Sequence, residues 1–185
     1  IENSYALSKN KSTGEWDWVG VVNAPYNVPV VYRNAYRYEN TQGFIDPDSN
    51  KALYFEVTAD QIKDGSLASA LHMYKNKNID GTVWGQEVGV DEYPKLTGTI
   101  SGAAAVKRSP LVLYTFDGDT ADYPDSYVNG IGLSLPVPVR ADYTFRGWYD
   151  NAEYSGKLYE AIPDTASGEQ VFYAKWWHIP QVTGG

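Results

Sequence analysis

The sequence predicts a mainly β or α+β protein, and three observations support this prediction. Aromatic residues are abundant, with 16 Tyr, 6 Trp and 5 Phe among 185 residues, and large aromatic side chains favour strands. The chain also holds 17 Gly and 10 Pro, the residues that form turns between short strands. Hydrophobic residues make up 43% and charged residues 21%, which excludes a disordered chain. We expect two β-rich units, of which the first contains one helix.

Three strands are predicted in the N-terminal part of the chain. They are Trp16 to Val22, Val28 to Tyr38 and Leu53 to Val57, separated by segments rich in Pro, Asn and Asp. The first four residues, Ile1 to Ser4, have the composition of a linker. Val182 to Gly185 have the same character, and we therefore expect a fragment cut from a longer chain.

A helix is predicted near residues 59–77. Thr58 can cap its start, because Gln61 stands three residues later as the partner in a capping box. Ile62, Leu67 and Leu71 provide a buried stripe. Gly65 interrupts this pattern, so two shorter helices, the second capped by Ser66, are the alternative.

Two further strands and a domain boundary follow the helix. The strands are expected near Thr82 to Trp84 and near Leu96 to Ile100. Lys107-Arg108-Ser109-Pro110 lies between two hydrophobic runs and is the best candidate boundary. We predict a first domain over residues 1–108, a second over 111–177, and a linker over 178–185.

The second domain is expected to be built from strands. The predicted strands are Leu111 to Phe116, Leu133 to Pro136, Tyr143 to Tyr149 and Val171 to Trp176. Strict alternation along Tyr143 to Tyr149 places Phe145 on one face and Trp148 on the other. Phe145, Trp148 and Trp176 are the candidate core aromatics.

Four landmarks in this half resemble the Listeria–Bacteroides repeat, also called the internalin B-repeat. They are a strand ending in Phe116-Asp117, then Leu133-Ser134-Leu135-Pro136-Val137-Pro138, Tyr143-Thr144-Phe145-Arg146-Gly147-Trp148-Tyr149 and Tyr173-Ala174-Lys175-Trp176. The resemblance covers about residues 111–177 and implies a small β-grasp-like module of a secreted or wall-attached bacterial surface protein. Such modules stand beside other modules of the same parent chain.

The chain departs from the repeat pattern at two places. Asp142 stands where the family usually has glycine, and Gly118 to Asp122 replaces a frequent Asn-Gly-Gly turn. The first departure indicates an altered turn, and the second leaves an acidic loop. Residues 1–108 carry no family resemblance.

Charge and missing motifs exclude several classes of function. The net charge of −8 argues against nucleic acids and anionic membranes, which require clustered Lys and Arg. The sequence has no cysteine, no apolar run long enough to span a bilayer, and no nucleotide-binding glycine loop. Neither histidine, His72 or His178, belongs to a catalytic motif. We expect a non-enzymatic, extracellular protein without membrane insertion.

The candidate ligand site lies in the first strand pair. Trp16 and Trp18 share one face of a strand, so these rings and Tyr36 could stack on a sugar, with Asp17 and Arg33 as polar partners. The same spacing also describes a strand whose rings face a core. Both interpretations remain open from the sequence.

One acidic turn is a candidate calcium site. Asp117, Asp119 and Asp122 could supply oxygen ligands, although no EF-hand pattern surrounds them. The alternative is a solvated turn with acceptor side chains. Apart from calcium, no cofactor is expected.

These observations lead to two functional hypotheses. The first is a non-catalytic surface module with an adhesion or spacer role, whose partner is a host or cell-surface protein or glycan. The alternative is a carbohydrate-binding module of an exported multidomain enzyme.

Overall fold

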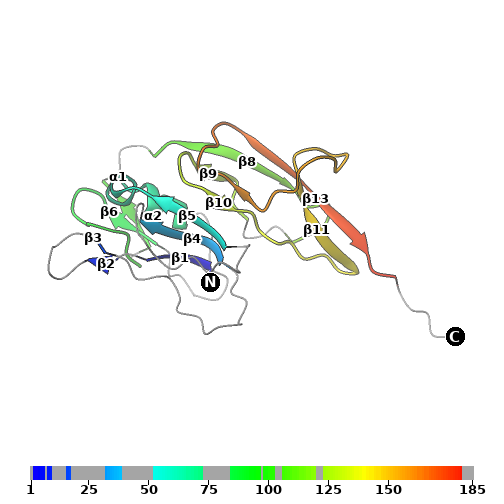
Figure 1. Cartoon of the computed structure of the whole chain (residues 1–185), viewed down its shortest axis with the longest axis horizontal. Helices are drawn as coiled ribbons and strands as arrows, with labels where there is room; N and C mark the ends of the chain where they lie inside the picture. Colours follow the sequence, from blue (N-terminus) through cyan, green and yellow to red (C-terminus); the bar gives the residue numbers. More distant parts are fainter. Residues whose placement is uncertain are drawn as a thin grey trace.

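The computed structural model describes residues 2–6, 8–9, 16–17, 32–38, 52–72, 84–96, 98–102, 106–119 and 123–180. Strands β1–β7 and two short helices form a first unit, and strands β8–β13 form a second unit beside it along the long axis of the molecule (Figure 1). Strands predominate over helices, which confirms the prediction of a mainly β or α+β fold.

The first unit is organised around a three-stranded sheet. Strands β1 (Glu2–Ala6), β4 (Tyr32–Tyr38) and β5 (Ala52–Val57) lie in the order β1-β4-β5, with both pairs parallel. Two short pairs complete the unit: β2 (Ser8–Lys9) with β3 (Trp16–Asp17), and β6 (Gln86–Glu87) with β7 (Ile100–Ser101).

Two sequence-based predictions for this unit need correction. The segment Ile1 to Ser4 was expected to be a linker, but Glu2 and Ser4 belong to β1 and pair with β4. The strand expected near Leu96 to Ile100 begins only at Ile100, as β7, whereas the strand expected near Thr82 to Trp84 falls mostly outside the described residues. In both cases the strand is formed by pairing with a segment that is distant in sequence, and local strand propensity does not predict such pairing.

The helical segment consists of two helices, α1 (Ala59–Lys63) and α2 (Ser66–His72). The capping box is present: the Gln61 amide donates to Thr58 Oγ1 at 3.2 Å, and the Thr58 amide donates to Gln61 Oε1 at 2.9 Å. Gly65 has φ +87° and ends the first helix. One continuous helix is therefore wrong, and two helices form as in the alternative, although Ser66 is the first residue of α2 and not its cap; residues 73–77 lie outside the described residues.

The second unit contains a four-stranded mixed sheet. Its strands are β8 (Arg108–Tyr114), β9 (Ser126–Val128), β11 (Tyr143–Tyr149) and β13 (Gln170–His178), in the order β11-β13-β8-β9. The central pair β8 and β13 is parallel, and the two outer pairs are antiparallel. This is the β-grasp-like arrangement that the sequence predicted, and β11 has the predicted bounds.

One face of this sheet carries the core of the second unit. Strands β10 (Leu133–Ser134) and β12 (Ala161–Ile162) pair with each other and contribute to this core. Its buried members are Leu111, Tyr127, Leu133, Leu135, Trp148, Ile162, Phe172 and Ala174. The indole N–H of Trp148 donates to the carbonyl oxygen of Pro136 at 2.7 Å, so the polar group of this buried ring has a hydrogen-bond partner.

A β-bulge changes the orientation of side chains along β11. The register with β13 shifts between Phe145 and Gly147, which leaves Arg146 as the extra residue. Both Phe145 and Trp148 therefore pack with the second core, and their rings meet edge to face at 5.5 Å. The prediction that they lie on opposite faces is wrong, because a bulge breaks the two-residue alternation.

The predicted boundary segment is part of the second sheet. Arg108, Ser109 and Pro110 belong to β8 and pair with β9. Ser109 is buried, and its hydroxyl donates to Asn129 Oδ1 at 2.7 Å and accepts from the Gly168 amide at 3.1 Å. The exact division at residues 108–111 stays a prediction.

Candidate functional site

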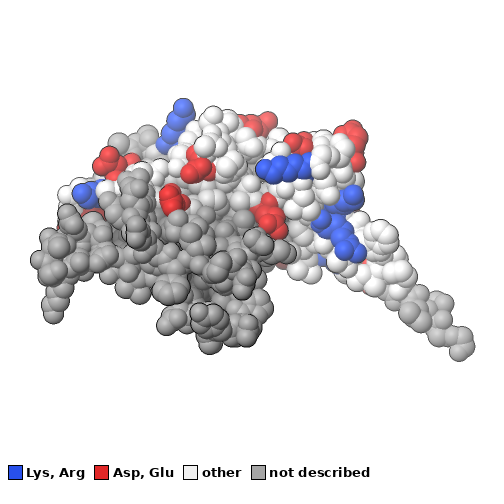
Figure 2. All heavy atoms as spheres, viewed as in Figure 1, with Lys and Arg blue, Asp and Glu red and all other residues white. Residues whose placement is uncertain are grey.

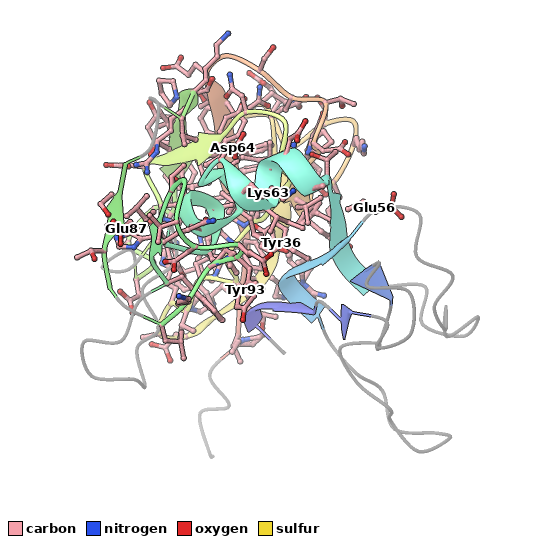
Figure 3. The ribbon with its side chains drawn as sticks, turned by 90° about the vertical axis from the view of Figure 1, so that its left-hand side faces the viewer. Tyr36, Glu56, Lys63, Asp64, Glu87 and Tyr93 are labelled. Atoms are coloured by element: carbon pink, nitrogen blue, oxygen red, sulfur yellow. The ribbon has the colours of Figure 1, made fainter. Side chains whose placement is uncertain are left out.

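The predicted sugar-stacking site is contradicted at Tyr36. This side chain is completely buried, and its hydroxyl donates to the carbonyl oxygen of Gly132 at 3.1 Å. Burial also raises the pKa of the Tyr36 hydroxyl above its ordinary value. Figure 3 shows Tyr36 inside the first unit, beneath helix α1. Tyr36 is a core residue because the neighbouring α1–α2 segment and the 128–132 loop enclose it.

The other residues of that predicted site are described only in part. Trp16 and Asp17 form β3, and Arg33 lies in β4, but their side chains fall outside the described part of the chain. Trp18 lies outside the described residues altogether. Their role in binding stays a prediction.

Asp117, one of the three predicted calcium ligands, lies beside an arginine. This carboxylate is 90% exposed, and its Oδ2 lies 3.5 Å from Nη2 of Arg140. Asp119 donates its amide to the Val139 carbonyl, and Asp122 lies outside the described residues. Within the described ranges, no three acidic or histidine side chains gather as metal ligands.

Another candidate site is the sheet face that points away from the second core. Tyr114 of β8, Tyr173 and Trp177 of β13, and Tyr149 of β11 point to this side, since their strand neighbours pack in the core. Phe116 extends the group beyond the end of β8. These five rings, together with Lys175 and Arg146, are called the outer face below.

Three of the rings are substantially exposed. The exposed fractions are 47% for Tyr114, 44% for Phe116 and 61% for Trp177. Tyr114 and Tyr173 are register partners, and their rings are parallel within 18° with centroids 4.8 Å apart. Phe116 lies 6.5 Å from Tyr173. Aromatic side chains of this size are normally buried when a core is available, so their exposure calls for an explanation.

Two cations lie among these rings. The Lys175 ammonium is 5.2 Å from the ring centroid of Tyr149 and 5.7 Å from that of Tyr154. The Arg146 guanidinium is 5.6 Å from the Trp177 ring. Among the described residues neither cation forms an ion pair. Figure 2 shows Lys and Arg atoms near the C-terminal end of the second unit, with Asp and Glu atoms beside some of them.

The loop beside the outer face is held by its own polar contacts. Asp150 accepts from the Asn151 side-chain amide at 2.8 Å and from the Tyr159 hydroxyl at 2.9 Å. These bonds lower the pKa of Asp150, and the bond to Asp150 raises the pKa of Tyr159. The loop therefore holds Tyr154 near Tyr149, where the two rings meet edge to face at 5.9 Å.

The outer face was not predicted, although the alternation of buried and exposed residues along two of its strands can be read from the sequence. Alternation in Leu111 to Phe116 separates Leu111 and Leu113 from Tyr114 and Phe116, and Tyr173 alternates with buried Phe172 and Ala174. The missing information was which side of the sheet receives β10 and β12.

Comparison with known proteins identifies one segment. No curated protein matches the chain, and no solved structure matches it. None of the helices in the described residues is long and apolar enough to span a membrane. Residues 112–175 match the family model of the Listeria-Bacteroides repeat domain, which confirms the resemblance that the sequence landmarks indicated for this part of the chain.

Proposed function

We propose that this chain is a non-catalytic module of a bacterial surface protein that contributes to adhesion by binding an extracellular protein through the outer face. The Listeria-Bacteroides repeat is typical of bacterial surface proteins, and this supports the proposed location. The observation that carries the proposal is the cluster of exposed rings around Tyr114, Phe116 and Trp177.

The composition of the outer face suits a protein interface. Tyr, Trp, Phe and Arg are the residue types enriched at the centres of such interfaces, and Trp, Tyr and Arg dominate their binding energy. The outer face combines these types on a sheet, where the strand backbone holds each ring in place. Such a surface binds with little loss of conformational freedom.

The arrangement of the rings favours a protein over a sugar as the partner. A sugar ring stacks on an open aromatic face, but the rings of Tyr114 and Tyr173 cover each other. Arg146 lies over Trp177, and Lys175 lies near the rings of Tyr149 and Tyr154. Ring edges and hydroxyl groups are therefore the main contact groups, and these suit the varied surface of a protein.

Binding arrays of extracellular proteins and of glycans test the proposal with a fluorescently labelled chain. The variant Tyr114→Ser with Trp177→Ser should weaken binding to a protein target about tenfold or more, because exposed aromatic anchors carry much of the binding energy. The control is Val90→Ser with Leu96→Ser, since these apolar side chains are 69% and 60% exposed but belong to the first unit.

Each result of the arrays has a defined meaning. Loss of protein binding in the outer-face variant alone supports adhesion through this face. Binding to glycans only would favour the carbohydrate-binding alternative. Unchanged protein binding in the variant would show that the outer face is not the binding site. A wild-type chain that binds no target would favour the spacer role.

A further inference from the structure

A loop of the repeat reaches into the core of the first unit. Val128 and Ile131 are buried, and both pack with Tyr36, Val57, Leu67 and Leu71 rather than with the core of their own unit. Residues 128–132 are called the docking loop below. They lie inside the segment 112–175 that matches the repeat family.

The docking loop is shaped by contacts within the second unit. The Asn129 amide donates to the Lys107 carbonyl at 3.0 Å, and the Asn129 side chain accepts from Ser109. The Ile131 amide closes a turn onto the Val128 carbonyl at 3.3 Å, with Gly130 at φ +82°. The loop therefore has its conformation from its own unit.

The first unit completes its hydrogen bonds with this loop. Gln61, the capping-box residue of α1, donates from Nε2 to the Gly130 carbonyl at 2.8 Å. Tyr36 donates to the Gly132 carbonyl. The Phe55 ring packs directly on Gly132, where an added Cβ would lie 1.9 Å from a ring carbon. Strand β4, strand β5 and helix α1 thus all contact residues 130–132.

The dependence between the two cores is asymmetric. Among the described residues, the first core includes two residues of the repeat, whereas every member of the second core lies between Leu111 and Trp176. Without the docking loop, the first core loses Val128 and Ile131 and leaves the buried Tyr36 hydroxyl unpaired. Without the first unit, the second core keeps all its members.

We infer that the docking loop is an interaction surface whose partner is the first unit of the same chain, and that the first unit requires the repeat in order to fold. The repeat itself does not require the first unit. The first unit fits this surface because the Tyr36 hydroxyl and the Gln61 side-chain amide donate to the Gly132 and Gly130 carbonyls. This inference is independent of the proposed adhesion.

Two matched variants of the full chain test the inference by amide hydrogen exchange. Ile131 and Ile162 are the same residue type, are 1% and 0% exposed, and both lie in the repeat segment, but they belong to different cores. Ile131→Ala should accelerate exchange in α1, α2 and β5 roughly 30-fold or more and leave β11 and β13 unchanged. Ile162→Ala should accelerate exchange in β11, β13 and the first unit together.

Two results would overturn the inference. One is unchanged protection of α1 and α2 in Ile131→Ala, and the other is equal acceleration of β11 and β13 in that variant. Because Ile162→Ala could unfold the chain, Ile162→Val provides the milder form with the same expected pattern. Leu67→Ala, in the first core, should accelerate exchange in the first unit only.

Discussion

The hydroxyl of Tyr36 donates a 3.1 Å hydrogen bond to the carbonyl oxygen of Gly132, 96 residues further along the chain. Tyr36 lies in β4 of the first unit, and Gly132 closes the docking loop of the repeat. The bond is buried, so neither group can exchange its partner for water without opening the junction.

Removal of the Tyr36 hydroxyl should weaken the first unit. Tyr36→Phe keeps the ring but leaves the buried Gly132 carbonyl without its donor, which should lower the free energy of unfolding by about 1–3 kcal/mol. Urea denaturation followed by circular dichroism measures the change. A variant as stable as the wild type would mean that another group satisfies this carbonyl.

The contribution of Tyr36 should also depend on pH. Burial raises the pKa of its hydroxyl in the folded state, so its stabilising contribution is fully present below the unfolded pKa of about 10 and is lost as pH rises further. The stability difference between wild type and Tyr36→Phe should therefore be constant up to about pH 9 and shrink as the pH rises above about 10. Urea unfolding of both proteins at several pH values tests this, and a difference that stays constant over the whole range would contradict it.

An added methyl group at Gly132 should disrupt the packing of the docking loop. Its Cβ would overlap the Phe55 ring, which is itself packed against the first core and has little room to move. Gly132→Ala should therefore cost about 1–3 kcal/mol of unfolding free energy. In a double-mutant cycle, Gly132→Ala should cost less in a Phe55→Ala background, because that change removes Cγ, Cδ1 and Cε1, the three ring atoms nearest the new Cβ. Additive effects would rule out the contact as the cause.

The bulge in β11 should require glycine at position 147. Gly147 has φ +121°, a conformation that is strained for other residues, and an added Cβ would also lie 2.5 Å from a methyl of Leu158. Gly147→Ala should cost about 2–3 kcal/mol, measured by thermal or urea unfolding.

Gly156→Ala is the matched control for the bulge. Gly156 also has a positive φ of +82°, but an added Cβ there meets nothing within 4 Å, so the expected cost is only about 1 kcal/mol. The added Cβ at position 147 would also lie 2.8 Å from Cγ of Leu158, so Leu158→Ala should restore the part of the loss in Gly147→Ala that comes from this contact. Equal costs at positions 147 and 156 would contradict a special role of the bulge.

Features with local causes could be predicted from the sequence. The Thr58 capping box depends on a residue three positions away, and the bounds of β11 follow from a run of strand-forming residues ended by polar ones. The repeat landmarks stand in one continuous segment, so they identified the family match and the β-grasp-like sheet. Trp148 was correctly placed in a core because a large aromatic ring in a small unit is normally buried.

Features with distant causes could not be predicted in this way. The spacing around Tyr36 fits both a ligand-facing ring and a core ring, and the docking loop makes it a core residue by covering it. Phe145 and Trp148 share a face because the pairing with β13 forces a bulge at Arg146. The outer face exists because β10 and β12 pack on the opposite side of the sheet. Short-range chemistry thus specified the elements, whereas burial depended on which distant segments came into contact, since hydrophobic packing is not directional along the chain.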